Sequence, residues 1–394
     1  MKYTVNIIIG VIIIYLFAVL ARGIYNKKKA FINKIAPAPS IILDKVTPTP
    51  TLPVTPGSPA PGKRYFVSSG GNDGNNGLSD KKPFKTIQKA VDLAVAGDTV
   101  YLLPGEYMQD IVSKNNGSQG QSITISGTKE SVVKGGGNTN IVEINNSYIK
   151  LDGFTIDGLF KQPREKLSFR DKLVYVISTV PGVGVTGFNM TNMDVKNSRS
   201  ECVRLRYFTQ NSEISHNSIS GCGRGDFEFN NGGKNGEGIY VGTAPEQRTN
   251  GKNPTSDIDH SNNNWIHHND INTQGNECVD VKEGSSFNIV EYNNCTGQKD
   301  PNSGGFDSRG NNNIFRLNTV FDNLGVGVRL GGDTAYDGID NEVYNNVIIN
   351  NKEGGIKFEQ APQGKVCGNS LNGNGKANSV GSFTAQFDPG SPCN

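Results

Sequence analysis

Short stretches in which apolar and polar residues alternate recur along most of this chain, with turns rich in asparagine and glycine between them. Six of these stretches align with one another, and they begin at Glu201, Glu237, Glu277, Gly304, Val326 and Gly354. The residue numbers put their starts 36, 40, 27, 22 and 28 positions apart. One short strand per repeat at such an irregular period is typical of a solenoid. Stacked strands would then bring distant residues about 4.8 Å apart.

An amphipathic segment precedes these repeats. Residues 83–96 place Ile87, Ala90 and Val91 on one helical face, which predicts a helix between strands at 65–68 and 99–103. The open end of a solenoid exposes apolar side chains and unpaired backbone, so a covering helix is physically reasonable there. We therefore predict an all-β protein, a right-handed parallel β-helix over residues 63–394 with an N-terminal capping helix. The alternative, a β-propeller, would have more equal repeats and more aromatic residues.

Two segments of different composition come before the predicted β-helix. Residues 1–35 contain a nearly unbroken apolar run and then a basic flank, which predicts one hydrophobic helix that is either a signal peptide or a membrane anchor. Residues 36–62 contain eight prolines among threonine and serine, a composition typical of an extended linker. We expect an extracytoplasmic main domain, which is either secreted or anchored in the membrane by its N-terminal segment.

The overall charge and the cysteines narrow the possible functions. A formal net charge of +2 over 394 residues argues against nucleic acid as the main partner, and we expect a monomer. No CxxC pair is present among the six cysteines, so a zinc ribbon is not expected. Cys202 and Cys278 lie two strands apart, too far for one disulfide. Cys367 and Cys393 would tie down the C-terminus, although unpaired buried thiols are an open alternative.

The outward positions of the six aligned repeats are mostly charged. Since alternate residues of a strand point to opposite faces, the apolar residues face inward and the residues between them face outward on one strip. We call this the charged strip, and it contains Arg204, Tyr240, Asp280, Asp307, Arg329 and Lys357, with Arg206, Lys282 and Arg309 two residues further along. Insertions at 227–234, 243–261 and 298–303 would wall a groove beside it.

These residue types support proton abstraction from a sugar acid. Glu237, Glu277 and Asp280 offer the hard oxygen ligands that Ca²⁺ prefers. We expect Arg309 to push Lys282 toward its neutral form, which makes Lys282 a usable base, while Arg309 stays charged and binds a carboxylate. A metal on a uronate carboxylate acidifies the adjacent C–H, and loss of that proton leads to β-elimination of the glycosidic bond. Tyr240, Asp307, Arg329 and Arg206 are expected to contact the substrate, an acidic polysaccharide.

A family resemblance supports this chemistry. The region 65–107 looks like the N-terminal cap of many carbohydrate-active β-helices, and the segments 277–282 and 306–310 are similar to the core of the chondroitinase B/alginate lyase family, polysaccharide lyase family six. The resemblance implies that Glu277 and Glu237 are calcium ligands, that Lys282 is the Brønsted base and that Arg309 is the acid. This chain has Gly275 where that family has a second acidic ligand.

Three other functions stay open. Asp280 and Asp307 on neighbouring coils have the spacing of a retaining glycoside hydrolase. A uronate epimerase shares the proton-abstraction step, but the Asp-Pro-His-Asp element of mannuronan epimerases is absent from the sequence. The third alternative is a non-catalytic, anchored rod that binds glycans or has a structural role at the cell surface.

Overall fold

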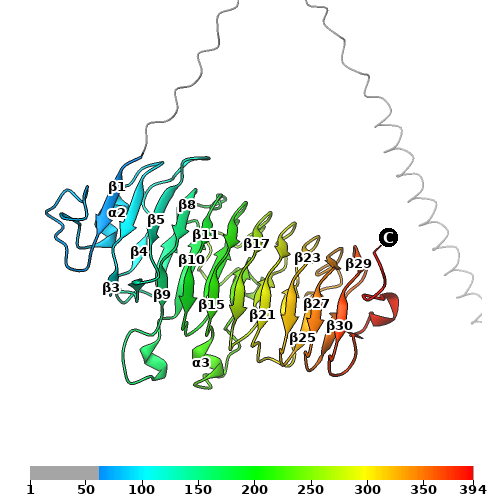
Figure 1. The fold of residues 1–394 in the computed structure, drawn as a ribbon. Helices are drawn as coiled ribbons and strands as arrows, with labels where there is room; N and C mark the ends of the chain where they lie inside the picture. The colour runs from blue at the N-terminus through cyan, green and yellow to red at the C-terminus, as the bar shows by residue number, and fades with distance from the viewer. Residues whose placement is uncertain (1–61, 394) are drawn as a thin grey trace, which may run out of the picture. The chain divides into compact units, whose positions relative to one another are not determined.

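The computed structural model describes residues 62–393, and in this part of the chain the backbone winds into a right-handed parallel β-helix (Figure 1). Each coil contributes one short strand to each of three sheets, and neighbouring strands of these sheets run parallel, for example β16 (Ile239–Val241) beside β19 (Val279–Val281). The predicted fold class is confirmed. The expected N-terminal hydrophobic helix and proline-rich linker lie outside the described residues. No helix within 62–393 is long and apolar enough to cross a membrane.

Three stacks of strands form the walls of the β-helix. The first sheet has 11 strands: β1 (Arg64–Val67), β2 (Thr99–Leu102), β5 (Ile123–Gly127), β8 (Ile149–Asp152), β11 (Asn189–Thr191), β14 (Glu213–Ser215), β17 (Trp265–His267), β20 (Ile289–Glu291), β23 (Ile314–Arg316), β26 (Glu342–Tyr344) and β29 (Val366–Cys367). The third has 10 strands: β3 (Gly105–Tyr107), β6 (Ser131–Val133), β9 (Thr155–Asp157), β12 (Asp194–Lys196), β15 (Ser218–Ser220), β18 (Asp270–Asn272), β21 (Asn294–Thr296), β24 (Thr319–Phe321), β27 (Val347–Ile349) and β30 (Ser370–Asn372).

The second sheet carries the charged strip. Its 10 strands are β4 (Ile111–Val112), β7 (Asn140–Ile144), β10 (Lys172–Ile177), β13 (Val203–Arg206), β16, β19, β22 (Gly304–Ser308), β25 (Val326–Leu330), β28 (Gly354–Phe358) and β31 (Ser379–Val380). Val279, Phe306, Val328 and Ile356 of successive strands are fully buried inside the β-helix. The period-two prediction of inward and outward faces is therefore confirmed.

Buried asparagines join the coils at one turn. The side-chain amide of Asn269 donates to Oδ1 of Asn293 (2.9 Å), and that of Asn293 donates to Oδ1 of Asn318 (3.1 Å). Asn318 continues the ladder to Asn346 and also donates to the carbonyl oxygen of Val290. A buried amide is tolerated only when its polar atoms are paired, and this ladder pairs them while holding the coils in register.

The capping helix is present and is shorter than predicted. Helix α2 (Ile87–Leu93) buries Ile87, Ala90 and Val91 against the first coils, as the sequence indicates. It begins later than residue 83 because Thr86 is its N-cap and accepts a hydrogen bond from the backbone N–H of Lys89. The other helices are short: α3 (Arg224–Phe227) and the 3-10 helices η1 (Lys166–Ser168), η2 (Pro245–Gln247) and η3 (Thr384–Gln386).

All six cysteines form disulfides, so the alternative of free thiols is wrong. The predicted Cys367–Cys393 bridge is present near the C-terminus. As expected, Cys202 and Cys278 do not pair with each other; the bridges are Cys202–Cys222 and Cys278–Cys295. These two disulfides stabilise the coils that carry the charged strip.

Candidate functional site

The charged strip forms as predicted, with one residue on each successive coil. The backbone register aligns residues of β13, β16, β19, β22, β25 and β28 in the order Arg204, Tyr240, Asp280, Asp307, Arg329 and Lys357. Adjacent members of this column are direct partners across parallel strands, so each is within reach of the next. The strip therefore places acidic and basic groups in contact along one face of the second sheet.

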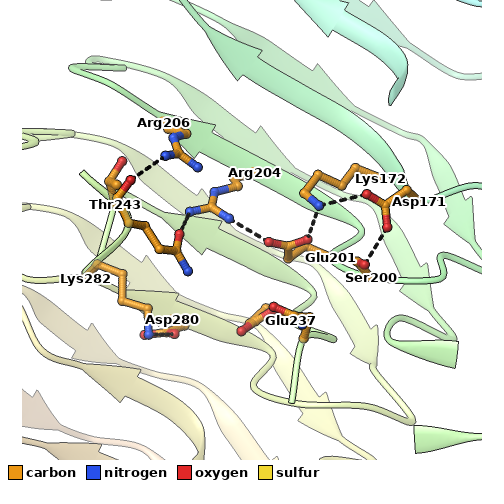
Figure 2. Close-up of polar contacts among 12 residues, drawn as sticks. Asp171, Lys172, Ser200, Glu201, Arg204, Arg206, Glu237, Thr243, Asp280 and Lys282 are labelled. Carbon is orange, nitrogen blue, oxygen red and sulfur yellow. Dashed lines mark hydrogen bonds and ion pairs between the residues drawn. The ribbon is translucent and has the colours of Figure 1, made fainter. Parts of the chain in front are cut away.

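Three carboxylates converge on this face. Glu237 and Glu277 come just before β16 and β19, outside the strict alternation of the strands, and their carboxylates meet that of Asp280. One oxygen atom from each lies within 4.8 Å of the others, and all three residues are buried. Figure 2 shows the carboxylate of Glu237 turned toward Asp280. We call Glu237, Glu277 and Asp280 the acidic cluster.

The electrostatics of the acidic cluster favour a cation. Burial, followed by the nearby charges of Glu201 and Asp280, raises the pKa of Glu237 to about 7. Burial and the charges of Asp280 and Glu237 likewise raise the pKa of Glu277 well above its ordinary value. Oε2 of Glu277 and Oδ1 of Asp280 have no hydrogen-bond partner among the described residues. Unpaired buried oxygens at this spacing are the ligands that Ca²⁺ takes in proteins.

Gly275 cannot be replaced by an acidic ligand in this backbone. A Cβ atom at Gly275 would lie 2.3 Å from the carbonyl oxygen of Cys222. The third carboxylate of the cluster comes instead from Glu237, one coil earlier. The sequence resemblance named Glu237 as an additional ligand, and the structure brings it to the cluster.

Lys282 lies beside the acidic cluster in its charged form. Its Nζ atom is 2.7 Å from Oδ2 of Asp280. Burial opposes the charge, but Asp280 and the Tyr240 phenol outweigh it and raise the pKa of Lys282 well above its ordinary value. The expectation that Arg309 holds Lys282 neutral is therefore wrong. The reason is distance: the closest charged group to the ammonium is a carboxylate.

Arg309 follows the end of β22, one coil after Lys282. Its Nη1 atom is 2.9 Å from Oδ1 of Asp333 and 3.5 Å from Oε1 of Glu283, while its Nε atom is 3.8 Å from Oδ2 of Asp307. Burial opposes its charge, but Asp307 and other carboxylates raise its pKa above the ordinary value. Arg309 is thus a fixed cation, as its chemistry predicts, and a poor proton donor, which does not fit the role of acid that the resemblance implies. Arg329 contacts both oxygens of Asp307 at 3.0 Å.

Tyr240 is not available to stack on a sugar. Arg204 lies 4.0 Å from its ring centroid and Lys282 lies 4.9 Å from it. Because Arg204 belongs to the coil before and Lys282 follows the strand after, both faces of the ring are covered. Only 3% of Tyr240 is exposed. Its hydroxyl has no hydrogen-bond partner among residues 62–393.

Arg206 is likewise removed from solvent. Its guanidinium donates to Oδ1 of Asn253 and to the carbonyl oxygen of Gln247, both in the insertion 243–261, and 1% of the residue is exposed. The expected role of Arg206 in substrate contact is not compatible with this conformation. The insertion covers the strip at this point.

A buried ion network next to the acidic cluster was not predicted. Glu201 lies 2.7 Å from Nη1 of Arg204 and 2.9 Å from Nζ of Lys172 (Figure 2). Burial alone would raise the pKa of Glu201, but these two cations lower it to about 2. The sequence contains a signal for this residue, because Glu201 begins the first aligned repeat just as Glu237 and Glu277 begin the next two. Its charge is already neutralised, so it is not a free metal ligand.

The other two insertions meet beside the acidic cluster. Lys234 of the insertion 227–234 lies 2.7 Å from Asp300 of the insertion 298–303. Ser303 donates a hydrogen bond to the Glu277 carboxylate. The prediction that these insertions flank the strip is therefore confirmed. Both insertions lie along the edge of the second sheet where Glu277 precedes β19.

A cavity of about 770 Å³ opens at the other edge of the strip. It runs across four coils, from Pro245 and Arg248 through Glu283 and Asn312 to Asp333. Glu283 and Asp333 are the residues that hold Arg309. The cavity thus lies directly beside the predicted catalytic pair, Lys282 and Arg309.

A protein-family model and a curated protein are similar to this chain in sequence. A family model with the description "Protein of unknown function (DUF1565)" matches residues 69–324. The uncharacterized protein YwoF of Bacillus subtilis (strain 168) is 34% identical over 109 residues. That match covers 25% of this chain and 23% of YwoF, so it spans less than a quarter of the curated relative.

Solved structures with the same fold include two polysaccharide lyases. The alginate lyase from Paenibacillus sp. str. FPU-7 superposes with a TM-score of 0.57 and 19% identity, covering 74% of this chain and 96% of that one. Pectate lyase Pel9A gives a TM-score of 0.54 and 12% identity, covering 85% of this chain and 82% of that one. The expected resemblance to β-helix polysaccharide lyases is confirmed in the fold.

Proposed function

The chain belongs to the DUF1565 family, and from the geometry of its site we propose that it is a polysaccharide lyase that cleaves uronate-containing chains by β-elimination. One observation carries the proposal: the acidic cluster lies against Lys282, with Arg309 on the next coil and a cavity beside them. A cation site, a candidate base and a fixed cation for a carboxylate are the three components that the reaction needs.

The residues present fit a Ca²⁺ ion. Three carboxylates supply up to six oxygens, and Ca²⁺ takes about 6 to 8 oxygen ligands, which leaves room for water or a substrate carboxylate. Bound Ca²⁺ would polarise the substrate carboxylate and offset the negative charge that now keeps Lys282 protonated. Glu237, Glu277 and Asp280 would hold it.

Lys282 and Arg309 have different roles in the proposed reaction. Lys282 in its neutral form takes the proton from the carbon next to the uronate carboxylate, the bond to the leaving oxygen breaks, and a C=C bond forms. Arg309 keeps its proton and stabilises the negative charge on the uronate. The leaving oxygen takes its proton from solvent, since the carboxylates around Arg309 hold the guanidinium in its charged form.

Absorbance of the unsaturated uronate product tests the proposal. The full chain is incubated with alginate, pectate or chondroitin sulfate, each with Ca²⁺ and with EDTA. The proposal predicts absorbance growth on one acidic polymer with Ca²⁺ and loss of it with EDTA. No unsaturated product on any of the three, with glycan binding retained, would instead favour an anchored glycan-binding rod.

A glycoside hydrolase is the second candidate, and the pKa of Glu237 near 7 favours it. A carboxylic acid that stays protonated near neutral pH can protonate a leaving glycosidic oxygen. Asp280 and Asp307 are direct register partners on adjacent strands and would supply the second carboxylate. A hydrolase would produce new reducing ends without unsaturated product. Its Lys282→Ala variant would also keep part of its activity.

We also propose an extracytoplasmic location. Three disulfides in one domain are typical of an oxidising compartment, which supports secretion or display at the cell surface. An acidic polysaccharide would be encountered there. Labelling of intact cells with an antibody against residues 62–393 tests this location.

A further inference from the structure

The insertion 243–261 closes the strip on one side of the acidic cluster. Gln247 accepts a hydrogen bond from Arg204 at 2.5 Å, and Asn253 accepts one from Arg206. Both arginines are almost fully buried under the insertion. Figure 2 shows these arginines beside Glu237 and Asp280; they lie one coil before Glu237 and two coils before Asp280. A sugar chain therefore finds no free surface on the strip next to the cluster in this direction.

The insertion is fastened at its base. Thr243 donates to Oδ2 of Asp259 at 2.6 Å, and Asp259 accepts the backbone N–H groups of Tyr207 and Phe208 at 2.7 and 2.8 Å. Thr255 hydrogen-bonds to the hydroxyl of Tyr207 at 2.9 Å. These contacts join both ends of the insertion to the coil before the acidic cluster, so its position is fixed by several buried hydrogen bonds rather than by one.

The strip is accessible on the other side. The side chains of Lys282, Arg309, Arg329 and Lys357 are 12%, 27%, 14% and 28% exposed, whereas that of Arg204 under the insertion is 4% exposed. Pro245 and Arg248 of the insertion line one end of the cavity beside the strip, and Asp333 lines the other end. Four coils correspond to about 14 Å along the axis. The cavity is therefore bounded by the insertion and extends away from it.

From this geometry we propose that the protein acts on the ends of sugar chains and releases short products, with the insertion 243–261 as the end wall of the site. The inference rests on the proposed lyase function. A site that cleaves within a polymer needs free surface on both sides of the reacting bond. Here one side is occupied by the protein itself, so only the last sugar units fit between the insertion and Lys282.

Product size at low conversion tests the inference on the full chain. On the polymer that yields unsaturated product, the end wall predicts mono- or disaccharides from the first time point and little change in the size of the remaining polymer. A broad mixture of long oligosaccharides at early times would overturn the end wall while leaving lyase activity intact. A variant with residues 246–256 replaced by a short Gly-Ser linker keeps Thr243 and Asp259, and its products should shift to longer oligosaccharides.

Asn253→Ala is a second variant in case the shortened insertion fails to fold. It removes one anchor of the insertion and should shift the products in the same direction, with Asn138→Ala, an exposed site elsewhere, as the control.

Binding stoichiometry, measured with Lys282→Met protein and oligouronates of increasing length, adds a readout that needs no cleavage. One protein per chain at every length supports the end wall, and several proteins per long chain overturn it. Absence of both cleavage and binding rejects the proposed function and this inference together.

Discussion

The ammonium group of Lys282 lies 2.7 Å from Oδ2 of Asp280, which makes a candidate base and a candidate metal ligand a single buried ion pair. This pairing raises the pKa of Lys282 and favours its protonated form. Occupation of the acidic cluster by a cation would compete for Asp280 and so change the charge state of the lysine. Cation binding and the availability of the base are therefore coupled.

Replacing Lys282 with methionine should reduce the lyase rate about 100-fold or more, because general-base catalysis contributes at least that much. The measurement is unsaturated product formed per unit time at saturating polymer. Lys357→Met is the matched control: Lys357 lies in the same strip, pairs with Glu359 at 2.6 Å and should change the rate little. Equal losses in both variants would remove Lys282 from the mechanism.

The contribution of Glu237 to stability, measured without a cation, should fall as the pH rises. Glu237 has a folded-state pKa of about 7, above its unfolded value. The stability it contributes is complete below the unfolded pKa of about 4.3 and is lost as the pH rises through about 7. In EDTA, the wild type should lose about 2 to 3 kcal/mol of unfolding free energy relative to Glu237→Gln between pH 5 and pH 8.

Calcium should cancel this loss, because it stabilises the ionised carboxylates of the folded state. Urea unfolding at each pH, with and without Ca²⁺, provides the measurement. Superimposable stability profiles in EDTA and in Ca²⁺ would contradict the assignment of the acidic cluster as a cation site.

Replacing Glu201 with glutamine should destabilise the fold by about 3 to 5 kcal/mol, because Arg204 would lose its buried counter-charge and Lys172 would keep only Asp171. Glu228→Gln is the control. Its partner Arg164 lies in a more exposed ion pair, and such pairs contribute about 0 to 1 kcal/mol. Denaturant titrations of the two variants give the comparison. A cost for Glu201→Gln no greater than that for Glu228→Gln would show that the network is not stabilising.

Asn318→Ala interrupts the asparagine ladder in its middle and should cost about 1 to 3 kcal/mol, the range for leaving buried polar groups unpaired. The carbonyl oxygen of Val290 and the backbone N–H of Asn293 lose their partner. Asn138→Ala, at an exposed position, should stay within about 0.5 kcal/mol of wild type. The thermal unfolding midpoints of the two variants test the difference.

The fold and the order of the charged strip were predictable because each depends on local periodicity. Strand alternation determines which residues face outward, and parallel stacking then aligns Asp280 with Asp307 without further information. The strand β10 was not predicted, since its nearly continuous apolar run gives no alternation. The register of the aligned repeats places Glu237 next to Glu277, and both meet Asp280 because they lie just before β16 and β19, where the strict alternation of the strands does not apply.

The protonation of Lys282 and the burial of Arg206 were not accessible from sequence. The charge state of Lys282 depends on whether Asp280 or Arg309 is closer in space, which strand order alone does not specify. The burial of Arg206 depends on how the insertion 243–261 folds back over the strip. Neither alternation nor repeat length carries information on the path of an insertion.

A crystal structure of the protein grown with Ca²⁺ tests the central claim most directly. The account predicts an ion among Glu237, Glu277 and Asp280, with oxygen distances of about 2.3 to 2.6 Å and with Lys282 displaced from Asp280. An acidic cluster without an ion at saturating Ca²⁺, with Lys282 still paired to Asp280, would contradict it.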